Sequence, residues 1–160
     1  MKPIIIPSPQ RERWLTQHVP YRISILRGLT VCDEQGGPKG LFRPVFPCIF
    51  EASLIVCRWT ANFFGLHVHK GTLKLVHERK KTTDVFAIDV GGFLVDPNSL
   101  QPEQQKLLTS VLLGANVASA HPTREEIGLM DWEDVKPASV LLIEKTRKHL
   151  YDPLGMDLPE

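Results

Sequence analysis

The sequence predicts a mainly α-helical bundle of four or more helices, with an irregular or short-β segment at about residues 71–96. Residues 46–64 carry apolar side chains almost all around a helical projection, as expected of a helix buried on most sides. Residues 102–120 place apolar side chains at helical spacing, which predicts a second long helix with one buried face. The segment 71–96 has no such period, and two short apolar stretches are too few for a self-standing sheet.

Composition indicates a single soluble globular domain over residues 1–160. The 160 residues are 42% hydrophobic and 23% charged, which is ordinary for such a domain. The 19 basic and 18 acidic side chains nearly cancel and leave a net charge of +1. No overall field therefore draws the chain to nucleic acid or to a membrane surface, and only a local basic patch stays open.

The sequence also predicts a cytoplasmic protein that does not enter a membrane. Only three apolar residues, 4–6, lie between the first prolines, which is too short for a signal-peptide core. The longest apolar run, 48–64, contains Glu51 and Arg58 and is too short and too charged to span a bilayer. An odd number of cysteines without CxxC spacing favours free thiols in a reducing compartment: Cys32, Cys48 and Cys57.

The N-terminal part should begin with an extended arm over residues 1–8. Ser8 and Pro9 are suited to the cap and the first position of a helix, which should run to about His18. Pro20 is expected to interrupt that helix, because proline lacks the N–H that a helix interior needs.

A second helix is expected over 21–31, although Tyr21, Ile23 and Ile25 also alternate as in a strand. Residues 33–40 have the composition of a loop. The central helix follows over 46–64, and Gly65 is placed to end it with a positive φ.

The segment after the central helix divides into a charged part and an apolar part. We expect a charged helix over 72–80 and a short strand or extended piece over each of 84–90 and 93–95. Residues 96–99 form a turn and lead into the helix that runs from Pro102 to about Ala120.

Two further helices should follow. Residues 123–126 have the form of a capping box and predict a short helix. Asp134 is the expected cap of a final helix from about Val135 to Tyr151, which the pair Asp152 and Pro153 would end.

The first candidate site lies at the end of the helix 102–120. Asn116 is followed by small residues and then by His121, which precedes a proline. A histidine can move a proton to or from a ribose hydroxyl while an amide holds a phosphate oxygen. The structural alternative is that His121 caps helix carbonyls and Asn116 bonds an adjacent helix.

The stretch 114–121 (GANVASAH), together with 57–64 (CRWTANFF), resembles the paired helices of HEPN-like proteins. The resemblance covers residues 46–64 and 102–121, and the final helix loosely. It implies a helical domain whose active members are metal-independent RNases with the site at a dimer interface, often in toxin–antitoxin or phage-defence systems. The family pattern is an arginine, often a polar residue next, and a histidine four to six residues further on. Here Asn116 matches the polar position and His121 the histidine, but Ala115 replaces the arginine, and Arg58 from the earlier helix is the candidate substitute.

A second candidate is a polar stripe on the central helix. Glu51, Arg58 and Asn62 are seven and four residues apart, which places them on one narrow face. The stripe is read either as a pocket facing His121 or as a buried polar network that fixes the register of the helix.

Two other groups are weaker candidates. His67 and His69 would share one face of a strand, as two metal ligands do, but no obvious further ligand lies near them. Residues 79–81 are basic and indicate either an RNA-binding patch or a solvated surface. We expect no metal and no cofactor.

The sequence as a whole favours a non-catalytic interaction or regulatory protein that forms a homodimer, as an accessory of a defence or toxin–antitoxin system. Its partner would be RNA or another protein. The alternative is a divergent metal-independent endoribonuclease with His121 as general acid or base and Arg58 and Asn116 on the phosphate. A third reading is a small-molecule sensor with a pocket between the central helices.

Overall fold

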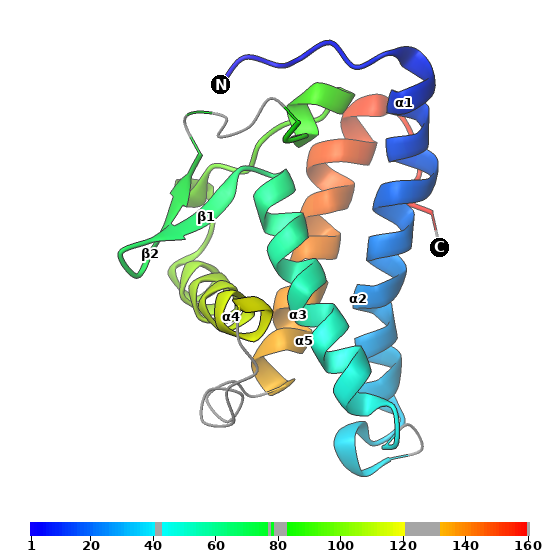
Figure 1. Ribbon diagram of the computed structural model, residues 1–160, viewed down its shortest axis with the longest axis vertical. Helices are drawn as coiled ribbons and strands as arrows, with labels where there is room; N and C mark the ends of the chain where they lie inside the picture. The colour runs from blue at the N-terminus through cyan, green and yellow to red at the C-terminus, as the bar shows by residue number, and fades with distance from the viewer. Residues whose placement is uncertain (41–42, 77, 79–82, 121–131, 160) are drawn as a thin grey trace.

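The computed structural model describes residues 1–40, 43–76, 78, 83–120 and 132–159. The chain is mainly helical, with one two-stranded hairpin, which confirms the predicted fold class. An N-terminal rod over residues 8–34 lies side by side with α3 (Phe46–Phe63) and α5 (Trp132–Thr146). Helix α4 (Pro102–Ala120) crosses them steeply and is seen almost end-on in Figure 1. None of the described helices combines the length and apolar character needed to cross a membrane.

The N-terminal rod is one helix where two were expected. It comprises α1 (Ser8–Arg13), a π-helical turn at Trp14–His18 and α2 (Val19–Glu34), so the prediction that Pro20 interrupts the helix is wrong. The N–H of Val19 donates to the carbonyl of Trp14, five residues back. This wider turn accommodates Pro20, because it removes the close contact between a proline ring and the carbonyl four residues earlier.

The helix predicted over 21–31 is confirmed and extends to Glu34, three residues beyond the expected end. The following loop contains a short 3₁₀ turn at Gly37–Lys39. The loop expected over 33–40 therefore begins two residues later than predicted, at Gln35.

The central helix α3 forms the middle of the core, as its apolar composition predicted. It packs against α2, α4 and α5, and Gly65 follows it with a φ of 78°, as expected of the glycine that ends a helix. Cys57 and Ala61 are fully buried on this helix, and Leu54 nearly so. One core cluster joins α3 to the other helices and to the hairpin.

A β-hairpin takes up the first part of the charged helix expected over 72–80, and residues 77, 79 and 80 of that range lie outside the described residues. Strand β1 (Leu66–His69) pairs antiparallel with β2 (Thr72–Leu75), with Leu66 opposite Leu75 and Val68 opposite Leu73. The two turn residues, Lys70 and Gly71, both have positive φ (49° and 73°), as a type I′ hairpin turn requires. The four apolar side chains share one face of the hairpin, and Leu66 and Leu73 are buried in the core.

The apolar segment 84–90 is not a strand, because its end folds into a 3₁₀ turn at Ala87–Val90. The buried carboxylate of Asp89 accepts hydrogen bonds from the backbone N–H groups of Phe86 (2.7 Å) and Ile4 (2.8 Å). The second bond ties the N-terminal arm to this turn. A side-chain acceptor within the segment therefore selects a turn over a strand.

The last two long helices match the prediction closely. Helix α4 has the predicted bounds, and its apolar face is buried at Leu108, Val111, Leu112 and Ala115. Helix α5 begins at Trp132, so Asp134 lies in the first turn and is not the cap. A carboxylate there is still favourable, because the helix N-terminus carries partial positive charge. The capping box predicted at 123–126 lies outside the described residues.

Helix α5 leads into a π-helical turn like the one in the N-terminal rod. A second π-helical turn, Arg147–Tyr151, continues it, and a 3₁₀ turn at Asp152–Leu154 follows. The predicted end at Asp152 and Pro153 is thus confirmed. Both π turns are followed by one residue and then a proline, Pro20 in one case and Pro153 in the other.

Candidate functional site

A pocket of about 580 Å³ lies beside the C-terminal end of α3. Its walls come from the first π turn, from α3, from the hairpin and from the segment around residues 83–86. Figure 1 shows how the end of α3 meets the hairpin at this place. The described residues that line the pocket are Trp14, Trp59, Asn62, Phe63, His67, Leu75, Val76, Glu78, Thr83, Asp84, Val85 and Phe86.

Three nearly parallel rings form one wall of the pocket, and we call Trp14, Trp59 and Phe63 the aromatic platform. The ring centroids of Trp59 and Phe63 are 5.2 Å apart, with planes 10° from parallel. Trp14 lies 5.7 Å from each of the other two, at 11° to Trp59 and 2° to Phe63. Each such pair contributes about 0.5–1.5 kcal/mol beyond the area it buries, so the platform is a stable feature.

Local geometry explains how the platform forms. Trp59 and Phe63 are four residues apart on α3, so their side chains share one face of the helix. Trp14 comes from a distant part of the chain and is the first residue of the first π turn. Its ring also meets the ring of His18 at 5.3 Å.

A cation already lies against the platform. The guanidinium carbon of Arg22 is 3.9 Å from the ring centroid of Trp59, which is a cation–π contact. Nη1 of Arg22 also donates a hydrogen bond of 2.8 Å to the backbone carbonyl of His18. Partial burial lowers the pKa of Arg22 from its usual value, and the nearby Tyr21 opposes this shift.

Polar groups occupy the remaining walls. Asn62 comes from α3 and His67 from β1, whereas Glu78, Thr83 and Asp84 lie along the segment after the hairpin. Carboxylate and amide oxygens accept hydrogen bonds, and amide N–H and hydroxyl groups donate them. An aromatic wall faced by a few polar side chains is the usual design of a small-molecule site.

The two described residues that were predicted for catalysis do not line this pocket. Arg58 is half-buried on α3, and Asn116 is exposed near the end of α4. His121 lies outside the described residues, so the predicted group of three is not seen as a unit. The described lining of the pocket includes neither Arg58 nor Asn116.

The polar stripe is not a buried network, and that interpretation is wrong. Glu51 and Asn62 are both exposed, and only Arg58 is half-buried. The reason is the orientation of α3, whose opposite face carries Ser53, Cys57 and Thr60 into the core. Of the stripe, only Asn62 reaches the pocket.

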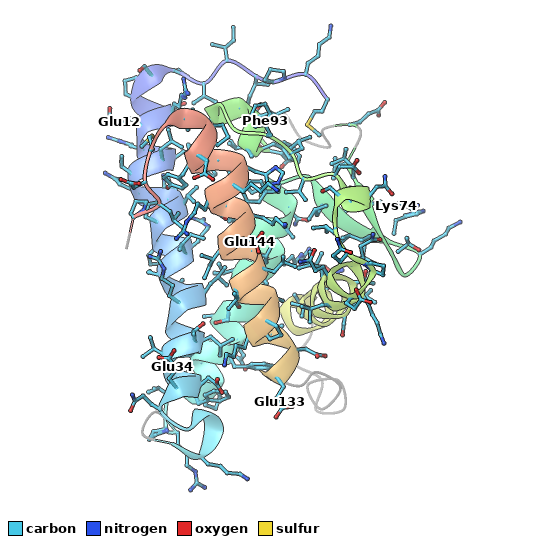
Figure 2. The ribbon with its side chains drawn as sticks, turned by 180° about the vertical axis from the view of Figure 1, so that it is seen from behind. Glu12, Glu34, Lys74, Phe93, Glu133 and Glu144 are labelled. Atoms are coloured by element: carbon cyan, nitrogen blue, oxygen red, sulfur yellow. The ribbon has the colours of Figure 1, made fainter. Side chains whose placement is uncertain are left out.

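The two histidines of the candidate metal site lie in different surroundings. His67 is half-buried and lines the pocket, whereas His69 is exposed at the hairpin turn. Among the described residues, no three histidine, cysteine or acidic side chains are close enough to hold a metal ion. The basic residues 79–81 lie outside the described part of the chain. Lys74 projects from the hairpin away from the helices, as Figure 2 shows.

Sequence reasoning missed the aromatic platform. The spacing of Trp59 and Phe63 was visible as an i, i+4 pair on an apolar helix. Such a pair is usually core, and nothing local to it indicates that Trp14 lies alongside. The platform depends on how the N-terminal rod packs against α3.

Comparisons of the chain with models of protein families, with curated proteins and with solved structures found no match. The fold and the pocket therefore define the protein by class alone. It is a mainly α-helical protein with an aromatic-walled pocket between its N-terminal rod, its central helix and a β-hairpin.

Proposed function

We propose that this chain is a non-catalytic regulatory protein that binds a small organic molecule in the aromatic pocket. The observation that carries the proposal is the pocket of about 580 Å³ walled by Trp14, Trp59 and Phe63. Ligand pockets commonly have volumes of about 300–1,000 Å³ and combine apolar walls with a few polar groups.

A regulatory role follows from the position of the pocket. Its walls belong to the N-terminal rod and, much later in the chain, to the consecutive elements α3, the hairpin and the segment 83–86. A ligand that contacts all of them favours the arrangement in which they are packed together. Binding would then change the stability of that arrangement and the surface it presents to a partner.

The test is ligand screening by thermal shift and by tryptophan fluorescence, using aromatic fragments of charge −1, 0 and +1. A molecule that binds only the folded state raises the melting temperature as its concentration rises. We expect Trp14→Leu to weaken binding by about tenfold, since it removes one ring of the platform. Phe93→Leu is the matched control, because Phe93 is an exposed aromatic side chain and is not among the described residues that line the pocket.

Two results would contradict the proposal. One is a panel in which no fragment shifts the melting temperature of the unaltered protein. The other is unchanged fragment affinity in Trp14→Leu when circular dichroism shows that the variant is folded.

A second candidate function is the metal-independent endoribonuclease with His121, Asn116 and Arg58. Its support is that α3 and α4, which carry Arg58 and Asn116, pack directly against each other. The test is RNA cleavage in EDTA by the protein and by His121→Ala. Cleavage that persists in the variant would count against this assignment.

We further propose that the protein acts in the cytoplasm. Cys32 and Cys57 are buried, Cys48 is exposed, and none is in a disulfide, which supports a reducing cytoplasm. We also propose that the chain forms a homodimer, is related to the HEPN-like proteins and acts in a defence system. Light scattering of the purified protein tests the first of these.

A further inference from the structure

We propose that the N-terminal arm, residues 1–7, is a strap that holds one wall of the aromatic pocket in place through the carboxylate of Asp89. Docking of the arm and the shape of the pocket are then coupled, so that a change in either one alters the other. The strap itself does not depend on the proposed function, because it concerns the pocket and no particular ligand. Its effect on ligand affinity rests on that function.

The wall that the strap holds is the segment 83–86, which lines the pocket. This segment belongs to no helix or strand and leads into the 3₁₀ turn at Ala87–Val90. Segments without regular structure open at a low free energy unless tertiary contacts hold them. One such contact lies at the end of the segment, where the backbone N–H of Phe86 donates to Oδ2 of Asp89 at 2.7 Å.

The other oxygen of the same carboxylate holds the arm. Oδ1 of Asp89 accepts a hydrogen bond of 2.8 Å from the backbone N–H of Ile4, which is 85 positions away in the sequence. Asp89 is only 6% exposed, so its charge depends on donors from the protein. If the arm withdraws its N–H, the carboxylate must recruit water, and water enters only when the turn that holds Phe86 loosens. This is the physical link between the arm and the pocket wall.

The N-terminal rod fastens the same turn at a second place. Nε of Arg11, in α1, donates to the backbone carbonyl of Val90 at 2.9 Å. Trp14, three residues after Arg11, is part of the aromatic platform. The stretch 4–14 therefore supplies one wall of the pocket and also ties down the turn next to another wall. Figure 1 shows the arm running across this end of the bundle.

The arm is docked by a small contact. Ile4 and Ile6 are half-buried, whereas Ile5 between them is 98% exposed, as expected of an extended segment with one face on the protein. Ile6 packs against the core cluster. Because little apolar area is buried, the docking free energy is small enough for ligand binding in the pocket to change it.

The experiment removes the donor of the arm and follows the pocket wall. Ile4→Pro deletes the N–H that donates to Asp89 and is compatible with an extended backbone. Ile5→Pro is the matched control, because it makes the same substitution at an exposed side chain. Ile4→Ala keeps the N–H and removes most of the side chain, so it separates the hydrogen bond from the packing.

Two readouts report on the pocket without a ligand. All variants carry Trp132→Phe, which leaves Trp14 and Trp59, two lining residues, as the only tryptophans. In Ile4→Pro we expect the amide of Phe86 to exchange about tenfold faster by NMR, and acrylamide to quench tryptophan fluorescence about twofold more strongly. Ile5→Pro and Ile4→Ala should stay close to the parent in both readouts.

A measurement on the unaltered protein covers the case in which Ile4→Pro does not fold. Native-state hydrogen exchange in low concentrations of urea should show the amides of Ile4 and Phe86 opening together, with the same dependence on urea. Free exchange of Ile4 while Phe86 stays protected would overturn the strap.

The outcomes separate the strap from the proposed function. Unchanged exchange and quenching in a folded Ile4→Pro overturns the strap, and so does an equal response in Ile5→Pro or Ile4→Ala. For a fragment that binds the unaltered protein, Ile4→Pro should weaken affinity by about three- to tenfold. If the Phe86 amide responds as expected but no fragment binds, the strap stands and the proposed function fails.

Discussion

The hydroxyl of Tyr151 donates a hydrogen bond of 2.6 Å to the backbone carbonyl of Leu15. The bond joins the two π-helical turns of the chain, Trp14–His18 and Arg147–Tyr151. Tyr151 is fully buried, and this burial raises the pKa of its hydroxyl to about 12. The hydroxyl therefore stays protonated and able to donate at neutral pH.

Pro20 explains why the carbonyl of Leu15 needs this partner. In the π turn the N–H of Val19 donates to the carbonyl of Trp14, five residues earlier. By the same pattern, the carbonyl of Leu15 would accept a hydrogen bond from the N–H of residue 20. That residue is Pro20, which has no N–H. A side chain from the far end of the sequence thus compensates for a donor that the proline removes.

Tyr151→Phe should lower the free energy of unfolding by about 1–3 kcal/mol, because it leaves a buried carbonyl without its donor. Urea denaturation followed by circular dichroism measures the loss. Pro20→Ala supplies an N–H near the same carbonyl, so it should reduce the cost of Tyr151→Phe in the double variant. Simple additivity of the two changes would contradict this account of the bond.

His149 should make the fold less stable in mild acid. Burial is the main cause that lowers its pKa, and the charges of Lys145 and Lys148 lower it further. A hydrogen bond to the backbone of Leu94 and the charge of Glu144 oppose this shift. Its ring also lies edge-on to Phe64 at a centroid distance of 6.4 Å. The folded state therefore resists the proton that the unfolded state accepts near pH 6.5.

The contribution of His149 to stability decreases as the pH falls. The stability that neutral His149 contributes is present above the unfolded pKa and is lost as the pH falls through the lowered folded pKa. Between about pH 7 and about pH 5, His149→Gln should lose less stability than the unaltered protein. Lys148→Gln should act in the same direction. Identical pH profiles for the protein and His149→Gln would rule this origin out.

Gly92 should tolerate no side chain. A Cβ at this position would lie 2.7 Å from the carbonyl oxygen of His149 and 2.9 Å from Cδ1 of Leu150. Gly92→Ala should therefore destabilise the protein by about 1–3 kcal/mol, since the adjoining backbone must shift.

Gly28 supplies the matched control for that substitution. It lies inside α2, and nothing is within 4 Å of the Cβ that alanine would add. Gly28→Ala should stabilise the protein by about 0.5–1 kcal/mol, because alanine favours the helix over the unfolded chain. Thermal melting of the two variants should move in opposite directions, and a shared direction would contradict the packing described at Gly92.

Two hydroxyl groups in the core should be dispensable. In the described part of the chain, Oγ of Ser53 and Oγ1 of Thr60 are buried without a hydrogen-bond partner. Thr60→Val keeps the volume and removes the buried polar atom, so it should be neutral or stabilise by about 1 kcal/mol. Ser53→Ala should also be close to neutral.

Ser139 on α5 provides the contrast. Its Oγ donates to the carbonyl of Val135 at 2.8 Å and lies 3.5 Å from Sγ of Cys57. Ser139→Ala should destabilise by about 0.5–1.5 kcal/mol in the same denaturation assay. A loss of more than about 1 kcal/mol in Thr60→Val would show instead that its hydroxyl is bonded.

The helices were predictable wherever the sequence has a clear period. The bounds of α4 match the prediction, and those of α3 differ by one residue, because periodic apolar spacing and the terminal glycine or proline are local signals. The hairpin was missed although Lys70 and Gly71 suit a type I′ turn. Four-residue strands are too short for the alternation of their side chains to outweigh a charged sequence.

The candidate site was less predictable than the fold. The sequence indicated a polar stripe on α3, but two of its three members are exposed. Periodicity places residues on a common face of a helix, and it does not determine whether that face meets solvent or a neighbour. That depends on the packing of the whole bundle.

The sequence by itself determined the mainly α-helical class and the bounds of α3 and α4 to within one residue, because these features depend on residues within a few positions of one another. Only the tertiary structure decided that Trp14 lies against Trp59 and Phe63, and that Tyr151 supplies the donor that Pro20 lacks. Both contacts join distant parts of the chain. They form because the N-terminal rod packs against both α3 and α5, and no local pattern encodes that arrangement.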